Sequence, residues 1–447
     1  MTVSWDTIRL VYPRRFQPVI NVLFGIVLGA AVGIGCGAVS GLVPGIHANT
    51  MAGVLLSLQA LLLAWFDPVV VASAMFATLV THTFLDNVPG PVVVASAMFS
   101  TLVTHTFLDN VPSTFLGIPD ADTSLAVLPA HALCLEGRGE EAVRISALGS
   151  AAGVALSLPL ALAFVLVLPA LQPAIDWGIG LVILAVAGYL IVVSESPGWA
   201  LAVFSVSGIL GLFSLGYSFL AWPAGGESGV LMPLLSGLFG IAVLLKASHG
   251  VMPAQHFSGI DLPRGTVRRS SLLGSVAGAL VGWLPGLSSA TANALLTSVI
   301  GYDSNPREYI LATSAANTVN AFLGLAAFYA VSRTRSGVMA AISALEEMPP
   351  ATAILLAGAI AAVGAYLLTI LFSSMAGWFS GVNVTNLNYA VIAFVVLLSL
   401  FLCGPFGGLI LLLATAVGYV PTLVNIRRVY CMGAIMVPVM VYSFGII

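Results

Sequence analysis

The chain has 447 residues, of which 59% are hydrophobic and only 7% are charged, and its mean hydropathy is +1.08. Since soluble domains carry about 25% charged residues, this composition excludes a soluble enzyme, a disordered chain and a nucleic-acid-binding protein. Two long stretches, 16–66 and 348–426, contain no Asp, Glu, Lys or Arg. Each exceeds the ~20 apolar residues that one membrane crossing requires. The sequence therefore predicts an all-α polytopic membrane protein that has the lipid bilayer as a partner.

Apolar segments recur along the whole chain and predict roughly 10–12 transmembrane or half-membrane helices. The most polar connection, 246–269, divides the chain into a first membrane repeat at 1–245 and a second at 270–447. The apolar segments lie at 17–40, 51–66, 145–170, 174–193, 199–222, 229–247, 270–301, 309–331, 351–374, 386–404, 405–424 and 431–447.

Arginine clusters next to the predicted spans indicate the orientation of the chain. Basic residues near span ends favour the cytoplasmic side, and they gather at 9–15 and 264–269 among other places. We therefore expect the N-terminal segment and the 246–269 connection to lie on the cytoplasmic side. The expected location is the cytoplasmic membrane of the cell, crossed many times.

A tandem duplication occupies 67–112. The segment 68–89 recurs as 91–112 after a shift of 23 residues, and Ala77 against Ser100 is the only mismatch. Repeats that serve a fold diverge and keep only their packing positions. This one is typical of a recent duplication or of an error in the gene sequence. We expect the second copy to be the working one and the first to be an added hairpin or helix.

A second repeat is old and faint. The segment 37–56 (GAVSGLVPGIHANTMAGVLL) aligns with 278–297 (GALVGWLPGLSSATANALLT) at an offset of 241 residues. Paired apolar segments interrupted by Gly and Pro, one in each half, mark the binding site in many transporters. A sequence alignment of this kind leaves open whether the two repeats run parallel or are inverted.

The interrupted segments predict re-entrant loops with an anion site between them. Pro and Gly stop a helix, and the Ser, Thr and Asn that follow are favoured N-caps. A half-helix that begins there directs N–H groups and a partial positive charge into the membrane, which suits a carboxylate or a phosphate. Two glycine kinks for close helix packing are the alternative. The predicted substrate-binding residues are Pro44, Gly45, His47, Asn49, Thr50, Pro285, Gly286, Ser288, Ser289, Thr291, Asn317 and Asn320.

Asp109 is the candidate for coupling to an ion, together with Asn110, Ser113 and Thr114. An ionisable group at membrane depth is a functional candidate, although Asp109 could instead cap a helix at the interface. Asn317 and Asn320 are three residues apart and so share a helix face, where they could line a cavity or join helices. No metal-ligand spacing, cofactor motif or catalytic constellation is evident, so we expect no metal, no cofactor and no enzymatic activity.

Three stretches, 41–56, 110–156 and 282–323, resemble the large permease subunit of the tripartite tricarboxylate transporters, the TctA family, and most closely its archaeal branch of uncharacterised membrane proteins. The resemblance implies a permease that works with a small membrane subunit and an extracytoplasmic binding protein, neither of which is evident in this chain. In the bacterial permeases an acidic residue stands where this chain has Ser314.

The sequence as a whole predicts a membrane transporter, with transport of an organic anion such as a carboxylate driven by an ion gradient. The alternative is a translocase for polyprenyl-phosphate or a related lipid carrier, because paired loops of this kind would bind a lipid phosphate as readily as a carboxylate. An enzyme is disfavoured, since no nucleophile and base are paired.

Overall fold

The structure is a computed structural model that describes residues 17–42, 51, 55, 90–116, 127–222, 230–245, 253–283, 289–297, 299–300, 305–345, 347–379 and 383–446. Every regular element within these ranges is a helix. Seven of the described helices are long and apolar enough to cross a membrane. These observations confirm the prediction of an all-α polytopic membrane protein.

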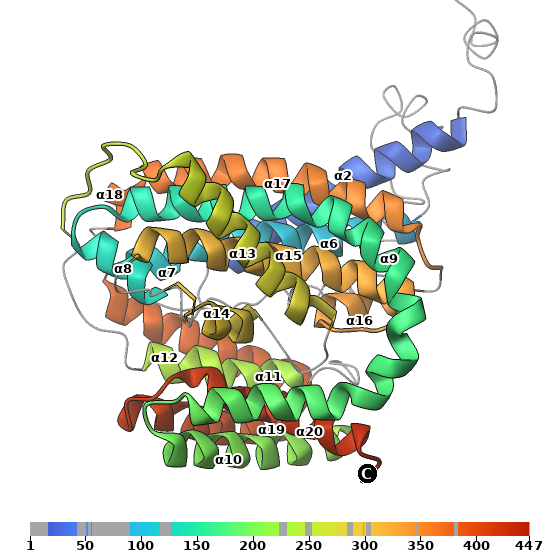
Figure 1. Cartoon of the computed structure of the whole chain (residues 1–447), viewed down its shortest axis with the longest axis vertical. Helices are drawn as coiled ribbons and strands as arrows, with labels where there is room; N and C mark the ends of the chain where they lie inside the picture. The colour runs from blue at the N-terminus through green and yellow to red at the C-terminus, as the bar shows by residue number, and fades with distance from the viewer. Residues whose placement is uncertain are drawn as a thin grey trace, which may run out of the picture.

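The described helices form two blocks that lie one above the other in Figure 1. The upper block contains α2 (Gln17–Leu42), α6 (Gly90–Leu108), α7 (Asn110–Leu116), α8 (Val127–Leu135), α13 (Arg264–Trp283), α15 (Pro306–Val331), α16 (Gly337–Ser343), α17 (Ala351–Ser374) and α18 (Ala376–Phe379). The lower block contains α10 (Pro197–Gly216), α11 (Leu231–Leu235), α12 (Ala242–Leu244), α19 (Val384–Leu423) and α20 (Gly433–Ser443). α14 (Ser289–Thr297) lies between them.

Two helices are long enough for more than one crossing. α9 (Gly139–Val192) has 54 residues and contains three prolines, Pro159, Pro169 and Pro173. Because Pro kinks a helix, α9 bends and runs through both blocks (Figure 1). α19 has 40 residues, and Gly404 at its centre has the non-helical angles φ 64° and ψ −159°. The chain turns back there, since a Cβ at Gly408 would meet Leu400, eight residues earlier, at 2.7 Å.

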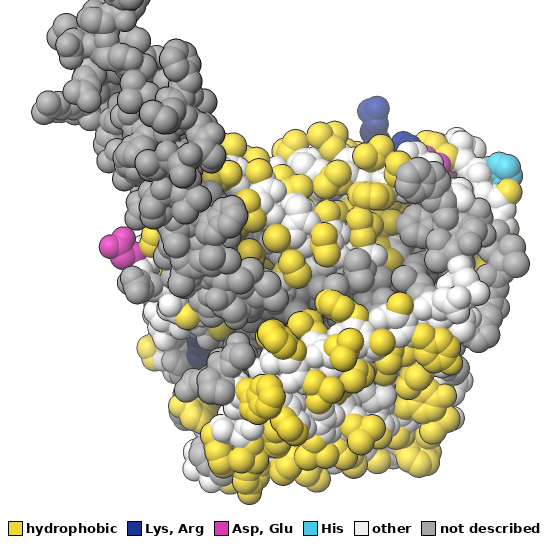
Figure 2. Space-filling view, turned by 180° about the vertical axis from the view of Figure 1, so that it is seen from behind, with side chains coloured by type: hydrophobic (Ala, Val, Ile, Leu, Met, Phe, Trp, Pro, Cys, Tyr) yellow, Lys and Arg dark blue, Asp and Glu magenta, His cyan; other side chains and the backbone are white. Residues whose placement is uncertain are grey.

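The outer surface is apolar, as contact with lipid requires. Leu166, Ile209 and Phe401 are 71%, 66% and 72% exposed, and they belong to three different long helices. Figure 2 shows hydrophobic side chains over most of the described surface on one face, with few charged groups. The exposed side chains of these helices therefore suit a hydrocarbon environment rather than water.

Close packing of two parallel helix pairs organises the upper block. Gly33, Gly37 and Gly41 of α2 approach α6 so closely that an added Cβ would overlap Ser100, Thr104 and Leu108 in turn. In the same way, Gly274 and Gly278 of α13 face the backbone of Ala312 and Ala316 of α15, and Gly282 faces Leu323 and Asn320. Small residues permit such close approach in membranes. In each pair the residue numbers rise together, so the two helices run in the same direction.

The two pairs run in opposite directions. Phe99 of α6 packs on Phe322 of α15, with ring centroids 5.3 Å apart, and Thr106 lies 3.2 Å from Thr318. As the α6 numbers rise along these contacts, the α15 numbers fall. α6 and α15 are therefore antiparallel, and the same relation holds for α2 against α13.

These directions bear on the predicted orientation of the chain. α9 runs parallel to α15, because Gly149 lies against Leu311 and Gly153 against Ala315. The starts of α9, α13 and α15 therefore share one side of the membrane, which carries arginines at 138, 144, 264, 268, 269 and 307. α2 begins at Gln17 on the other side. The described helices thus put the start of α2 at the opposite end of the block from the start of α13, whereas residues 1–16, on which the predicted side of the N-terminal segment depends, lie outside the described residues.

The arginine-rich side should be cytoplasmic, and cysteine labelling can check this. We expect Cys introduced for Asp261 to be protected from an impermeant maleimide in intact cells, and Cys introduced for Thr334 to be labelled. Both native side chains are exposed and they lie beyond opposite ends of α15. The four native cysteines are replaced first. Labelling of position 261 from outside would reverse the orientation.

Candidate functional site

A chain of polar contacts meets the start of α14. Ser289 is the first residue of α14, and its buried hydroxyl accepts a hydrogen bond of 3.0 Å from Nδ2 of Asn320. The Oδ1 atom of Asn320 accepts a bond of 3.3 Å from Nη1 of Arg335. Asn320 therefore links a helix N-terminus to a guanidinium. Both features attract an anion.

This helix start lies deep in the protein. Asn320 comes 14 residues after Pro306, which places it about 21 Å along α15 at 1.5 Å per residue. From there α14 runs back toward the arginine-rich side, because the Tyr309 hydroxyl donates to the carbonyl of Asn293 at 2.8 Å. The hydroxyl of Thr291 is fully buried and has no hydrogen-bond partner among the described residues. It is a polar group available to a ligand.

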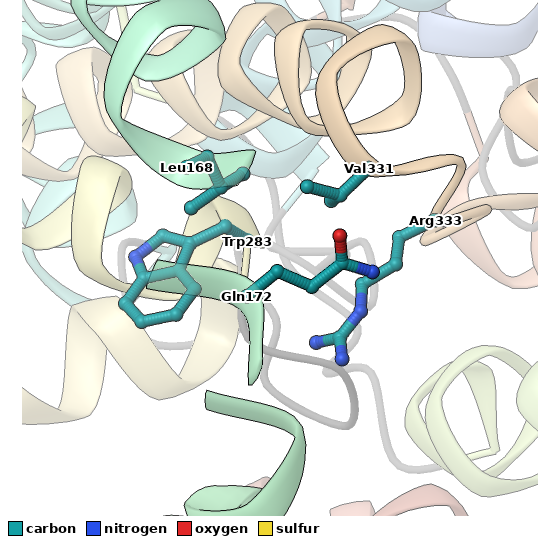
Figure 3. A pocket seen from close by; sticks show the side chains of 5 residues that line it. All are labelled: Leu168, Gln172, Trp283, Val331 and Arg333. Carbon is teal, nitrogen blue, oxygen red and sulfur yellow. The ribbon is translucent and has the colours of Figure 1, made fainter. Parts of the chain in front are cut away.

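A small pocket opens beside the same region. It is lined by residues of the α9 bend, of the end of α13 and of the end of α15, and encloses about 170 Å³ of space, its open mouth included. Figure 3 shows the Gln172 side chain extending toward Arg333, with the Trp283 ring on its other side. The lining residues are Leu168, Gln172, Trp283, Val331 and Arg333.

Neither Arg333, which lines this pocket, nor Arg335, which binds Asn320, was among the predicted site residues. Partial burial lowers the pKa of the Arg333 guanidinium below its ordinary value. An arginine pKa lies so far above neutrality that the group keeps its positive charge. The only sequence signal was the short distance of Arg333 and Arg335 from Asn320, 13 and 15 residues further along the chain. The 332–336 segment thus brings positive charge to a region where the interrupted segments themselves carry none.

A second cluster surrounds the carboxylate of Asp109. α6 ends at Leu108 and α7 begins at Asn110, so Asp109 lies at the break between them. Its side chain is 3% exposed. Oδ1 accepts a hydrogen bond of 2.7 Å from Nδ2 of Asn110, and Oδ2 accepts one of 3.0 Å from Nδ2 of Asn317. The structure thus brings the predicted ion-coupling residue Asp109 into contact with the predicted substrate-binding residue Asn317, while Asn110 binds Asp109 from the other side.

The carboxylate of Asp109 is buried inside the protein. Asn317 comes 11 residues after Pro306, about 16 Å along α15, which is half of a ~30 Å hydrocarbon core. Ser113 and Thr114 are also buried, and the carbonyl of Thr114 lies 2.8 Å from Nδ1 of His131.

Many of the predicted site residues cannot be placed. Of the predicted substrate-binding residues, the structure describes Ser289, Thr291, Asn317 and Asn320. The two asparagines bind different partners. Asn317 binds Asp109, whereas Asn320 binds Ser289 and Arg335. The remaining predicted substrate residues lie outside the described residues, namely Pro44, Gly45, His47, Asn49, Thr50, Pro285, Gly286 and Ser288. The first copy of the duplication, 68–89, lies there too, whereas the second copy forms α6 and the start of α7.

Long apolar helices and a lipid-compatible surface define a multi-pass membrane protein. The comparison with known families agrees, since residues 88–433 match the Tripartite tricarboxylate transporter TctA family. The chain belongs to this family, which is a family of membrane transporters. An uncharacterised protein of Methanocaldococcus jannaschii is 28% identical over 333 residues, which cover 73% of each chain. No solved structure matches the chain.

Proposed function

We propose that this protein moves an organic anion such as a carboxylate across the cytoplasmic membrane, and that an ion gradient drives the movement. The observation that carries the proposal is the contact chain from Ser289 through Asn320 to Arg335 at the start of α14. It combines a helix N-terminus, hydroxyl and amide groups and a guanidinium inside an otherwise apolar protein. Such a combination suits a carboxylate, which accepts hydrogen bonds from all of these groups.

The packing of the upper block supports two inverted repeats. Gly33, Gly37 and Gly41 precede Gly274, Gly278 and Gly282 by the same 241 residues as the sequence alignment. Their packing partners on α6 and α15 are also related by a constant shift, because Ser100 and Thr104 precede Ala312 and Ala316 by 212 residues.

The same shift relates Thr106 to Thr318, and these two side chains contact one another. In a two-fold arrangement, equivalent residues touch one another only at the axis. The Thr106–Thr318 contact therefore fits a pseudo-two-fold axis between the antiparallel helices α6 and α15. Inverted repeats of this kind, with the substrate near the membrane centre, underlie alternating access in many secondary transporters.

We further propose that the segments 43–50 and 284–288, both outside the described residues, complete the substrate site as re-entrant loops. α13 comes directly before the segment 284–288, and α14 comes directly after it. α14 runs back toward the arginine-rich side, where α13 begins, as expected for a re-entrant loop. A small membrane subunit and an extracytoplasmic binding protein would be the partners, as the tripartite family implies. The family match gives no support to the lipid-carrier alternative.

The test is anion exchange in proteoliposomes without any ion gradient, with radiolabelled citrate and succinate as probes. We expect exchange of at least one probe by the native protein. Arg335→Ala should slow this exchange at least about tenfold, because a charged hydrogen-bond partner is worth more than 1.4 kcal/mol. Arg335→Lys should retain part of the exchange.

Arg268→Ala is the matched control, because Arg268 is exposed near the start of α13, whereas the proposed anion site lies beyond the end of this helix. It should exchange the probe at the native rate. The proposed anion site is wrong if Arg335→Ala, correctly folded by size-exclusion chromatography, exchanges the probe as fast as this control.

A further inference from the structure

We propose that the carboxylate of Asp109 is the group that binds the driving cation, a proton or Na⁺, and that α15 connects this event to the anion site. This inference rests on the proposed function and names the coupling site within it. Three features support it, namely the fixed geometry of the carboxylate, the charges around it and its position relative to the start of α14.

The carboxylate is held in place on both sides. One oxygen accepts from the neighbouring Asn110 and the other from Asn317 of a different helix. The break between α6 and α7 at Asp109 leaves backbone carbonyls that no longer bond within a regular helix. A buried carboxylate with amide and carbonyl oxygens nearby offers the hard oxygen ligands that a small cation prefers. A single acidic group of this kind is also sufficient to bind one proton.

The structure describes other titratable groups on the helices that pack around this break. His105 precedes Asp109 by one turn of α6, and its Nδ1 lies 3.1 Å from the Ser40 hydroxyl of α2. His131 of α8 contacts the carbonyl of Thr114 on α7. The ionised side chains of α9 and α15 that the structure describes lie within the first two turns of these helices, and α17 and α18 carry none. These ionised groups are Glu140, Glu141, Arg144, Arg307 and Glu308.

The cation and anion sites are neighbours on α15. Asn317 and Asn320 are three residues apart, and side chains at this spacing lie about 5–6 Å apart at Cβ. One contacts Asp109 and the other contacts the start of α14. An ionised Asp109 would therefore repel an anion bound at α14 across a distance on the order of 10 Å. At the effective dielectric constant of a protein, this repulsion weakens anion binding about tenfold.

Neutralisation of Asp109 removes this repulsion, so the cation and the anion bind cooperatively. By linkage, each of them raises the affinity of the protein for the other by the same factor. An empty carrier keeps its negative charge in the membrane interior, which disfavours its conversion between the inward-open and outward-open states. Cation binding thus couples anion movement to the gradient without any contact between the cation and the anion.

The experiment compares gradient-driven accumulation with gradient-free exchange in proteoliposomes that contain the full chain, with radiolabelled citrate and succinate as probes. One arm imposes an inward proton gradient without Na⁺, and the other imposes an inward Na⁺ gradient at equal pH. Asp109→Asn has the same shape and is permanently neutral. It should lose gradient-driven accumulation at least about tenfold in the arm that drives the native protein, and its gradient-free exchange should no longer depend on the concentration of that cation.

Asp261→Asn is the matched control, because it makes the same substitution at an exposed position, and it should accumulate the probe as the native protein does. If Asp109→Asn does not fold, Asp109→Ser is the second neutral variant. Accumulation by a folded neutral variant at the native level, or exchange that still depends on the concentration of the driving cation as in the native protein, overturns the assignment of Asp109 and leaves the anion site standing. Absence of exchange by the native protein overturns the proposed function itself.

Discussion

Replacement of Gly274 by alanine is expected to lower the stability of the protein by about 2–3 kcal/mol. The reason is purely steric, because an added Cβ at this position would overlap the backbone carbonyl of Ala312. α13 and α15 would have to move apart, and the contacts of Gly278 with Ala316 would be lost in the same movement. Thermal unfolding in detergent, followed by size-exclusion chromatography, measures the effect.

The matched control is Gly265→Ala on the same helix, since nothing lies within 4 Å of an added Cβ at Gly265. Alanine restricts the unfolded chain more than glycine and favours helix, so this variant should be as stable as the native protein or more stable by about 0.4–1 kcal/mol. The two substitutions therefore have opposite expected signs. Equal stability of both variants would show that α13 and α15 are not packed at Gly274.

The fold class was readable from the sequence because a membrane imposes a simple rule. Stretches without charges, such as 348–426, cannot be solvated and must form helices when they cross lipid. The direction of each helix was harder to predict, since it depends on a correct count of every crossing before it. The half-length segments made that count ambiguous, so the side assigned to the N-terminal segment stays a prediction.

The candidate site could be predicted only where the signal is local. Asp109 is an acidic residue in an apolar region, and Asn317 and Asn320 are polar residues on one face of an apolar helix. The pairing of these residues required the structure, because Asp109 and Asn317 are 208 positions apart in the sequence. Arg335 was missed because it lies beyond the end of α15, and only the folding back of this segment brings it to Asn320.

Glu141 joins three parts of the protein on the arginine-rich side. Its side chain is 2% exposed and accepts from Nε of Arg138 at 2.7 Å on α9. It also accepts from Nε and Nη2 of Arg307 on α15, at 2.8 and 3.3 Å, and from the backbone N–H of Asp261 at 3.2 Å. A carboxylate that binds two guanidiniums in this way connects the first half of the chain, the 253–263 segment and the second half.

We expect Glu141→Gln to lower the stability by about 2–4 kcal/mol. Loss of one partner of a buried ion pair costs ~3–5 kcal/mol, because the remaining charge stays buried. Here the two arginines are partly exposed, Arg138 by 33% and Arg307 by 20%, so the expected loss of stability is smaller. Glu140→Gln is the control one residue away. Among the described residues Glu140 pairs with Arg144 in an i,i+4 pair whose side chains are 16% and 25% exposed, and a helix pair of this kind near the surface is worth about 0–1 kcal/mol. Thermal unfolding of the two variants in parallel measures both losses of stability. Equal losses of stability in Glu141→Gln and Glu140→Gln would mean that Glu141 does not hold the two halves together.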